Sequence, residues 1–316
     1  MTSETDTTRP GAHRLGWIGI GRMGYPMAQR LAKAGCDIAV WNRTRSKAEP
    51  LAAAGATIAD SVEALADRDI VFTMVSTSAD LEAVVSGPHG LLARPGRAPK
   101  VLIDCSTVST ESSAKVRAAM ERAGGAMLAA PVSGNAKVVK AGRLSIVASG
   151  PADAYALARP YLEAVGQGVS YVGEGELART VKICHNVLLG IVAQSLAEIT
   201  VLAERAGVPR HAFLDFINKS VMGSMFTRYK TPAIVNLDFT TTFTPVLLKK
   251  DLDLGLAAAR ELGVPMPLTA ATRELVQAVV GAGYADEDFM RLLTLEARGA
   301  GMALAPENVA VADGLS

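Results

Sequence analysis

The sequence predicts an α/β domain with a mostly parallel sheet, followed by an all-α domain. In the first half of the 316-residue chain, short apolar runs alternate with longer amphipathic segments, as in strand–helix–strand units. After Gly173 this alternation stops, and residues 176–206 form one long helical pattern without proline. The chain is long enough to bury a core in each of two domains.

The predicted elements alternate as far as Gly173. Apolar runs that predict strands are 15–20, 38–41, 70–75, 101–104, 126–130, 144–148 and 169–172. Amphipathic segments that predict helices follow most of them, at 24–34, 61–66, 79–86, 110–123 and 152–164. Strands that alternate with helices favour a parallel sheet covered by those helices.

The second half predicts helices only. They are 176–206, 210–218, 245–262 and 268–281, with no convincing strand between them. We place the first domain at 14–174 and the helical domain at 175–300, and we expect the long first helix to form the hinge. The remaining segments, 1–13 and 301–316, are polar or rich in Gly, Ala and Pro, which predicts disordered or loosely attached tails.

The composition argues against several classes of function. Lys and Arg number 32 and Asp and Glu 31, so no charge excess favours nucleic acid or a membrane surface. The three cysteines form no CxxC pair and predict reduced thiols in a cytoplasmic protein. The four histidines are too scattered for a zinc site. Since no signal peptide and no apolar run of about 18 residues occurs, we expect no membrane span.

A glycine-rich turn follows the first predicted strand. Gly19, Gly21 and Gly24 have the GxGxxG spacing, and Arg22 and Met23 complete the turn. The glycines of this motif permit a tight turn, close approach of a pyrophosphate and packing of helix on strand. The helix N-terminus then favours the anion. A turn without a ligand is the alternative, but its place in the first strand–helix unit favours a Rossmann-type dinucleotide-binding domain.

The residues after the second predicted strand indicate which nucleotide binds. Enzymes that use NAD usually have Asp or Glu there, bonded to the ribose 2′-hydroxyl. This chain instead has Asn42, Arg43 and Thr44, followed by Lys47. Arg43 can grip a 2′-phosphate with charge-assisted bonds, and Thr44 and Lys47 add a hydroxyl and a second cation. The alternative is a solvated loop. The pattern predicts a preference for NADP(H), with NAD(H) possible.

Five segments carry a resemblance to a known family. They are GIGRMGYPMA at 19–28, DCST at 104–107, APVSG at 130–134, KICHN at 182–186 and KKDL at 249–252. In this order they resemble the β-hydroxyacid dehydrogenases, which include 3-hydroxyisobutyrate dehydrogenases and glyoxylate/succinic semialdehyde reductases. The resemblance covers residues 15–283. It implies hydride transfer between the cofactor and a small 3-hydroxy acid or its semialdehyde.

The resemblance also implies roles for individual residues. Lys182 would relay the proton, which requires its pKa to fall from about 10.4 toward ~7–8. Asn186 lies four residues on, on the same helix face, and would orient the reacting oxygen. Ser133 and Gly134, a hydroxyl and bare backbone N–H groups after a strand, would hold a carboxylate. The alternatives are a plain turn at 133–134 and, for Lys182 and Asn186, a solvated helix face, which their apolar neighbours argue against.

Further residues follow from the same resemblance. Thr107, Val75 and Lys250 would contact the cofactor, with Thr107 also lining the substrate site. Asp251 and Phe243 would contact the substrate, although an ordinary core aromatic is an equal alternative for Phe243.

The chain also departs from the family. Asn135 stands where a second glycine is usual and is expected to narrow or polarise the carboxylate pocket. His185 stands where the family commonly has asparagine, and the resulting Lys-x-x-His-Asn pattern resembles that of the 6-phosphogluconate dehydrogenases. Those enzymes have a further acidic residue one helical turn later, where this chain has Leu189. The stretch from Gly173 to Lys182 is longer than usual, which leaves the register before Lys182 open.

Two other functions remain as alternatives. Imine reductases share this architecture, but they typically lack the lysine at position 182. A non-catalytic NADP-binding protein is the second alternative, and the presence of both Lys182 and Asn186 argues against it. We expect a small carboxylate as substrate, no nucleic-acid partner, and a homodimer or homotetramer formed through the helical domain.

Overall fold

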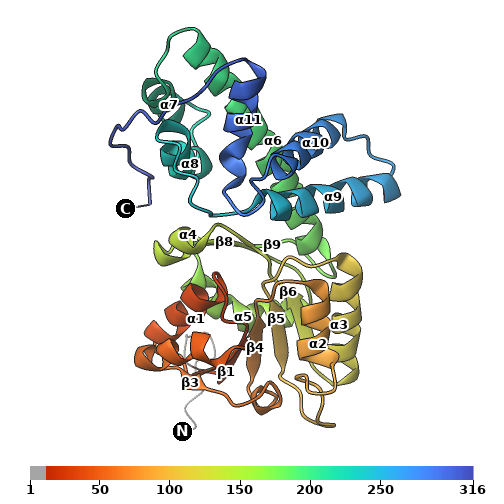
Figure 1. The fold of residues 1–316 in the computed structure, drawn as a ribbon. Helices are drawn as coiled ribbons and strands as arrows, with labels where there is room; N and C mark the ends of the chain where they lie inside the picture. Colours follow the sequence, from red (N-terminus) through yellow and green to blue (C-terminus); the bar gives the residue numbers. More distant parts are fainter. Residues whose placement is uncertain (1–11, 316) are drawn as a thin grey trace. The chain divides into compact units, whose positions relative to one another are not determined.

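The computed structural model describes residues 12–315, which form two compact units that divide between Lys182 and Ile183 (Figure 1). The first unit contains the sheets and the second contains helices, in agreement with the predicted fold class. The predicted boundary near 174 lies just before the long helix, whereas the units divide inside it.

The first unit is built on a six-stranded parallel sheet in the order β3-β2-β1-β4-β5-β6. The strands are β1 (Leu15–Ile18), β2 (Ile38–Trp41), β3 (Thr57–Ile58), β4 (Ile70–Thr73), β5 (Val101–Asp104) and β6 (Ala126–Ala129). The strand order reverses beside β1, because the chain runs from β1 toward one edge of the sheet and from β4 toward the other. A ligand crevice forms at such a switch point, outside the carboxyl ends of the strands.

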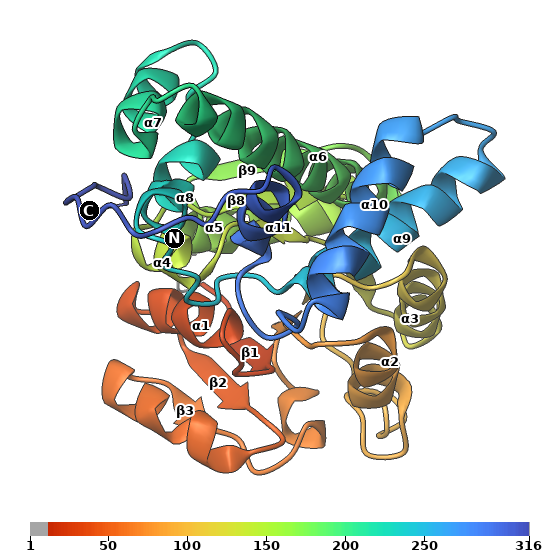
Figure 2. The ribbon, with the colours of Figure 1, turned by 45° about the horizontal axis from the view of Figure 1, so that its top comes forward.

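Helices cover both faces of this sheet. On one face, α1 (Gly24–Lys33) and α5 (Ala152–Val165) share a core with Leu15 and Trp17. On the other, α2 (Ser78–Ser86) and α3 (Thr110–Arg122) lie side by side and share a core with Ile18 (Figures 1 and 2). Alternate residues of β1 therefore serve opposite cores, as expected of a strand buried on both faces.

A second, three-stranded sheet follows the first. It contains β7 (Val132–Ser133), β8 (Ser145–Ala148) and β9 (Gly168–Tyr171), in which β7 and β8 are antiparallel. The short helix α4 (Ala136–Lys140) connects β7 to β8. The strands predicted at 144–148 and 169–172 thus belong to a separate sheet, and β3, β7 and α4 were not predicted because two-residue strands and one-turn helices carry too little periodicity.

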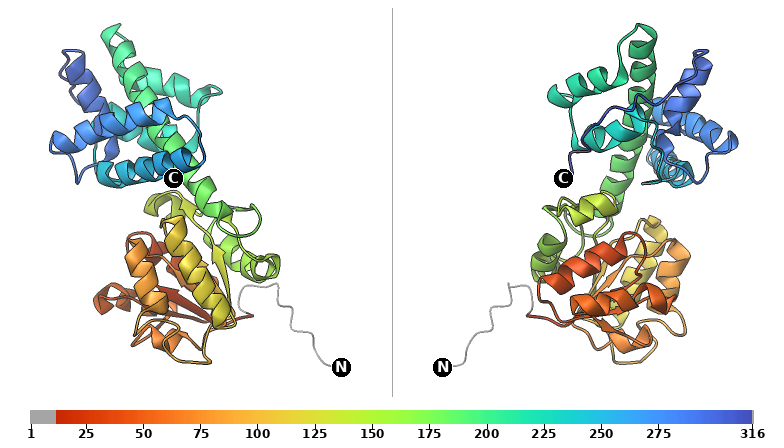
Figure 3. Two further views of the ribbon diagram at one scale, coloured as in Figure 1. Left: turned by 90° about the vertical axis from the view of Figure 1, so that its right-hand side faces the viewer. Right: turned by 60° about the vertical axis from the view of Figure 1, so that its left-hand side comes forward.

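The second unit is helical. Its helices are α6 (Leu177–Arg205), which begins in the first unit, α7 (Arg210–Lys219), α8 (Met225–Val235), α9 (Pro245–Glu261), α10 (Pro267–Gly281) and α11 (Leu292–Gly299). The long α6 is the green helix of Figure 3. Gly190 on α6 packs against Leu252, and Gly255 on α9 packs against Val187. Because these two glycines have no side chains, α6 and α9 can approach each other closely. The sequence pattern did not predict α8 and α11.

The first half of α6 is more exposed in the single chain than its apolar sequence predicts. Val181 is 42% exposed and Leu188 60% exposed, whereas Val187 between them is buried. The expectation of a largely buried segment is therefore wrong for one side of the helix. With a mean hydropathy of 1.7 over 18 residues, α6 is also long and apolar enough to cross a membrane. Half of that window is buried within the chain, however, as in a core helix of a globular protein.

The segment after α11 is attached more firmly than predicted. The Glu307 carboxylate accepts hydrogen bonds from the backbone N–H groups of Arg210 (2.6 Å) and His211 (3.0 Å) at the start of α7. Asn236 and Val309 exchange two more bonds, of 2.8 and 3.2 Å. The described part of the tail, 301–315, has no helix or strand but docks on α7 and α8, so loose attachment is a wrong prediction there. The predicted N-terminal tail, 1–13, lies outside the described residues except for its last two positions, 12 and 13.

Candidate active site

The glycine turn leaves no space for side chains at two of its three positions. A Cβ on Gly19 would lie 2.2 Å from the Met74 carbonyl oxygen, and one on Gly24 would lie 1.9 Å from the Gly19 oxygen. Gly19 also has a φ of +98°, a left-handed conformation that favours glycine. Nothing lies within 4 Å of a Cβ on Gly21. Backbone packing thus requires glycine at 19 and 24, whereas Gly21 faces open space where a phosphate can approach.

Asn42 holds this turn against the loop after β2. Its Oδ1 accepts a hydrogen bond from the Ile20 N–H (2.9 Å), and its Nδ2 donates to the Thr44 oxygen (2.9 Å). The amide side chain therefore connects the glycine turn to the residues predicted to select the nucleotide. Sequence reasoning assigned Asn42 to the cofactor but missed this bridging contact.

A cavity of about 690 Å³ opens at the carboxyl ends of β1, β2 and β4. It is lined by seven of the predicted cofactor residues: Gly19, Gly21, Asn42, Arg43, Thr44, Lys47 and Val75. Arg22, Met23, Gly24 and Thr107 do not line it. Sequence reasoning missed Glu63, Asp80 and His89 on its wall, because they come from separate loops that carry no motif.

Charges on the cavity wall are of both signs. The Arg43 guanidinium is 87% exposed and lies 3.7 Å from the Asp80 carboxylate. Hydrogen bonds from its own backbone N–H and from the Ser61 hydroxyl hold the pKa of Glu63 below its ordinary value. Glu63 is therefore charged at neutral pH. An exposed pair such as Arg43–Asp80 is worth little, so Arg43 can exchange this partner for a phosphate.

The predicted carboxylate cradle lies in the second sheet. Ser133 ends β7, and Gly134 follows with a φ of +134°. A Cβ on Gly134 would lie 2.8 Å from the Val138 side chain, so the position requires glycine. Asn135 caps α4, because its Oδ1 accepts from the N–H groups of Lys137 (2.9 Å) and Val138 (3.1 Å). This capping role of the Asn135 oxygen was not foreseen.

In the second unit, three predicted site residues, Asn186, Lys250 and Asp251, lie together with His185 on α6 and α9. Asn186 is buried, and its Nδ2 donates to Oδ2 of the buried Asp251 (2.6 Å). Its Oδ1 lies 2.9 Å from His185 Nδ1, a contact that requires the proton on that nitrogen. Lys250 Nζ lies 3.2 Å from Asp251 Oδ1. The structure thus fixes the orientation of the Asn186 amide through an acid and an imidazole.

Lys182 is the last residue of the first unit and is half-buried on α6, one helical turn before Asn186. The helix is continuous through both positions. Two side chains with this spacing on one helix project from nearly the same face.

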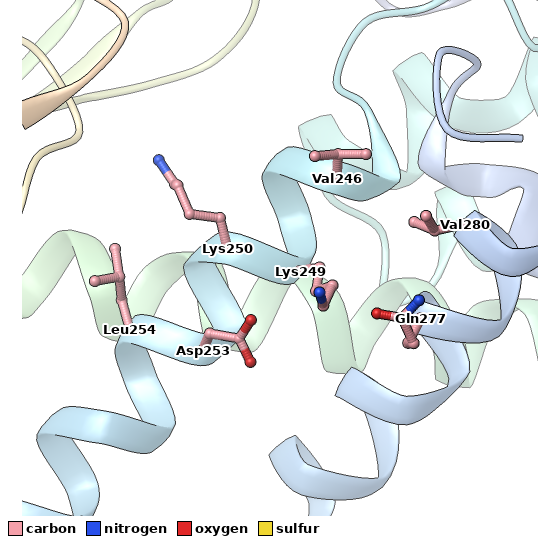
Figure 4. A pocket seen from close by; sticks show the side chains of 7 residues that line it. All are labelled: Val246, Lys249, Lys250, Asp253, Leu254, Gln277 and Val280. Atoms are coloured by element: carbon pink, nitrogen blue, oxygen red, sulfur yellow. The ribbon is translucent and has the colours of Figure 1, made fainter.

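Phe243 lies beside a buried ion pair of the second unit. Its ring meets Phe289 edge-on, with centroids 6.1 Å apart, and its oxygen accepts the Phe289 N–H (3.1 Å). The Asp288 carboxylate binds Lys230 Nζ at 2.7 and 2.8 Å, and both groups are buried. Sequence reasoning missed this pair. A separate groove between α9 and α10 contains Lys249, Lys250 and Gln277, of which only Lys250 was predicted (Figure 4).

Known families match almost the whole chain. Residues 14–173 match the NAD binding domain of 6-phosphogluconate dehydrogenase, and residues 176–295 match the NAD-binding domain of NADP-dependent 3-hydroxyisobutyrate dehydrogenase. The chain belongs to the β-hydroxyacid dehydrogenase family. It is an NAD(P)-dependent oxidoreductase.

Individual relatives agree with this family. The chain is 31% identical to glyoxylate/succinic semialdehyde reductase 2 of Arabidopsis thaliana, over 93% of this chain and 82% of the relative. It is 34% identical to 3-hydroxyisobutyrate dehydrogenase of Pseudomonas aeruginosa, over 83% and 90%. The solved 3-hydroxyisobutyrate dehydrogenase of Mycobacterium tuberculosis with L-serine has a TM-score of 0.76 at 29% identity, covering 90% and 98%. An imine reductase of Myxococcus stipitatus, at 22% identity and a TM-score of 0.58, shares the fold alone.

Proposed function

We propose that this enzyme uses NADP(H) to interconvert a small 3-hydroxy acid and its semialdehyde, with Lys182 as the proton relay. One observation carries the proposal: α6 presents Lys182 one turn before an Asn186 whose amide is fixed by Asp251 and His185. A lysine and an oriented amide on one helix face are suited to a carbonyl or hydroxyl oxygen. The relatives named for semialdehyde and hydroxy-acid chemistry support the same substrate class.

The first unit fits a dinucleotide. The turn that requires glycine at 19 and 24 leaves the space over Gly21 open, which suits a pyrophosphate beside the start of α1. Arg43, Thr44 and Lys47 on the cavity wall would hold a 2′-phosphate. The loop after β2, residues 42–47, contains no acid to bond the ribose 2′-hydroxyl, which supports NADP(H) over NAD(H).

The chemistry divides among the residues as follows. When bound, the nicotinamide supplies a hydride to the substrate carbon, or accepts one in the reverse direction. Lys182 Nζ donates a proton to the carbonyl oxygen during reduction and accepts it from the hydroxyl during oxidation. Asn186 orients that oxygen, and the Ser133 hydroxyl and the N–H of Gly134 bind the carboxylate.

A substrate panel tests this function. NADPH is supplied with glyoxylate, succinic semialdehyde or a cyclic imine, and NADP⁺ with 3-hydroxyisobutyrate or L-serine. We expect turnover with at least one of the two 3-hydroxy acids, 3-hydroxyisobutyrate and L-serine, and none with the imine. Turnover of the imine that exceeds that of every carboxylate would contradict the proposal. The methyl ester of the preferred acid serves as a control. We expect it to react much more weakly than the free acid, because it leaves the hydrogen-bond donors of the carboxylate cradle unpaired, at a cost of ~1–3 kcal/mol.

We also propose that the enzyme forms a homodimer or homotetramer through the helical unit. Large apolar side chains are exposed there in the single chain, including Leu188 and Leu202 on α6 and Phe216 on α7. Exposed apolar surface of this kind commonly marks an interface. Light scattering at several protein concentrations tests this proposal, and a monomer at all of them would overturn it.

A further inference from the structure

Arg179 is a buried cation near the start of α6. Only 2% of its side chain is exposed, and Asp104, its ion-pair partner at the end of β5, is completely buried. The guanidinium donates hydrogen bonds to the Asp104 carboxylate, to the backbone carbonyl oxygen of Ser106 and, at 3.2 Å, to the Ser113 hydroxyl on α3. All three nitrogens of the guanidinium therefore hold α6 to the sheet and to α3.

Asp104 continues this network toward the cofactor cavity. Its Oδ1 accepts hydrogen bonds from the hydroxyls of Thr73 (2.6 Å) and Ser106 (2.7 Å). The Ser106 hydroxyl in turn accepts the Val75 N–H at 2.9 Å, and Val75 lines the cavity. A chain of buried contacts thus runs from Arg179 to the cavity wall, entirely within the first unit.

Two further contacts anchor the same turn of α6, one a neutral buried hydrogen bond and the other a largely buried ion pair. The Ala178 N–H donates to the Ser149 hydroxyl at 3.0 Å, and the Arg117 Nε donates to Glu176 at 2.8 Å. Stability alone is a weak reason for an additional buried ion pair, because apolar residues of similar volume often replace such pairs without loss. What the pair does supply is a fixed geometry for the helix turn that leads into Lys182.

We propose that Arg179 is a positioning residue that sets the place of Lys182 relative to the cofactor cavity. Lys182 lies three residues later, on the adjacent turn of the same face. Because the Arg179 network also holds Val75, one set of contacts fixes both the base and the wall of the cavity. The proposal rests on the function given above for Lys182. A misplacement of about 1 Å at a reacting group can cost on the order of 100-fold in rate.

Arg179→Lys tests this role because it keeps the positive charge but cannot make the three-nitrogen contact. With NADPH and succinic semialdehyde, or the preferred carboxylate of the panel, we expect kcat to fall about tenfold. The KM for NADPH should change less than about threefold, because Val75 keeps its own hydrogen bond to the Ser106 hydroxyl and because Gly19 and Arg43 do not touch Arg179. A purely structural role would reduce the folded fraction without changing kcat per folded molecule.

Arg210→Lys is the matched control. Arg210 is equally buried, 1% exposed, and ion-paired with Glu204, but it lies in the helical unit near the tail. It should lower the melting temperature while leaving kcat within about twofold, since it touches no residue assigned to the reaction. An equal loss of kcat in both variants, or a kcat within twofold of native in Arg179→Lys, would overturn the proposal.

Ser113→Ala supplies a milder variant should Arg179→Lys not fold, since it removes a single contact to the guanidinium. We expect kcat to fall about threefold, in keeping with the loss of one hydrogen bond to a charged group. Hydrogen exchange over 177–183 gives a readout that needs no substrate, and both variants should accelerate it about tenfold. If the native enzyme turns over no compound of the panel, the proposed function fails, and unchanged exchange separately overturns the positioning role.

Discussion

The two units hold their candidate functional residues in different ways. In the first unit, backbone geometry shapes the cofactor cavity: Gly19 and Gly24 have no space for a side chain. In the second, side chains hold one another, with Asn186 between Asp251 and His185. A backbone-shaped site is sensitive to added atoms, whereas a side-chain network is sensitive to lost charges and hydrogen bonds.

Replacement of Gly24 by Ala should damage the first unit most. A Cβ 1.9 Å from the Gly19 oxygen forces the turn apart, so we expect loss of NADPH binding by at least ~100-fold together with reduced stability. Gly21→Ala is the matched comparison, because its Cβ meets nothing within 4 Å. It should keep its melting temperature but weaken NADPH binding. The contrast fails if both variants melt and bind alike, as measured by calorimetry and fluorescence titration.

Replacement of Asp251 by Asn should damage the second unit through chemistry and not through binding of the nucleotide. The Asn186 amide loses a charged acceptor, and we expect kcat to fall ~30-fold with the affinity for NADPH changed less than about threefold. The control is Asp215→Asn, which breaks only an exposed pair with Lys219 on α7. A kcat within twofold of native in Asp251→Asn would show that the Asp251 carboxylate does not contribute to catalysis.

Arg43→Ala should separate the two cofactors. The guanidinium is exposed and only loosely paired with Asp80, so its loss leaves the fold intact. A charge-assisted contact to a 2′-phosphate is worth ~1.5–3 kcal/mol, so we expect NADPH to bind at least about tenfold more weakly and NADH to be almost unaffected. Titration of both nucleotides on one preparation measures the ratio. Equal efficiency of the native enzyme with NADPH and NADH would show the preference to be wrong.

Glu307→Gln should have the smallest effect, on the docking of the tail. Burial alone raises the pKa of Glu307, but hydrogen bonds from the His211 side chain and from two backbone N–H groups hold it below its ordinary value. Such a carboxylate stabilises the fold above its unfolded pKa of about 4.3, and the contribution is lost as pH falls through the lower folded value. We expect a loss of ~1 kcal/mol at pH 7.

A pH series checks this prediction. The difference in melting temperature between native and Glu307→Gln should shrink as pH falls below about 4. Glu163→Gln, which breaks only an exposed pair with Arg159, should melt like the native protein throughout. If the native and Glu307→Gln proteins differ equally at pH 7 and at low pH, the carboxylate charge does not hold the tail.

The sequence predicted the first unit better than the second, for physical reasons. Parallel strands buried on both faces give continuous apolar runs, and the GxGxxG spacing reflects steric limits that the structure shows at Gly19 and Gly24. Short elements such as β7 and α4 have too few residues to show a period. Their hydrogen bonds, including the cap from Asn135, depend on a turn that only the folded chain defines.

Contacts between residues distant in the sequence were not predictable. The Asp104–Arg179 pair joins residues 75 positions apart, and Lys230–Asp288 joins residues 58 apart. No local pattern identifies such partners, and a lone arginine in a helix predicts a solvated side chain. Asp251 was singled out only through the family resemblance, and it was the structure that showed it to be hydrogen-bonded to Asn186.

The central claim is that Lys182 moves the proton while other residues hold the nucleotide. The most direct test is Lys182→Ala, with steady-state turnover and NADPH titration measured on the same protein. We predict that turnover falls by ~100-fold or more, the usual contribution of a positioned acid or base, while the Kd for NADPH stays within about threefold. Lys182→Arg should recover little, because a guanidinium does not release its proton near neutral pH. Turnover within a few-fold of native in Lys182→Ala would contradict the account.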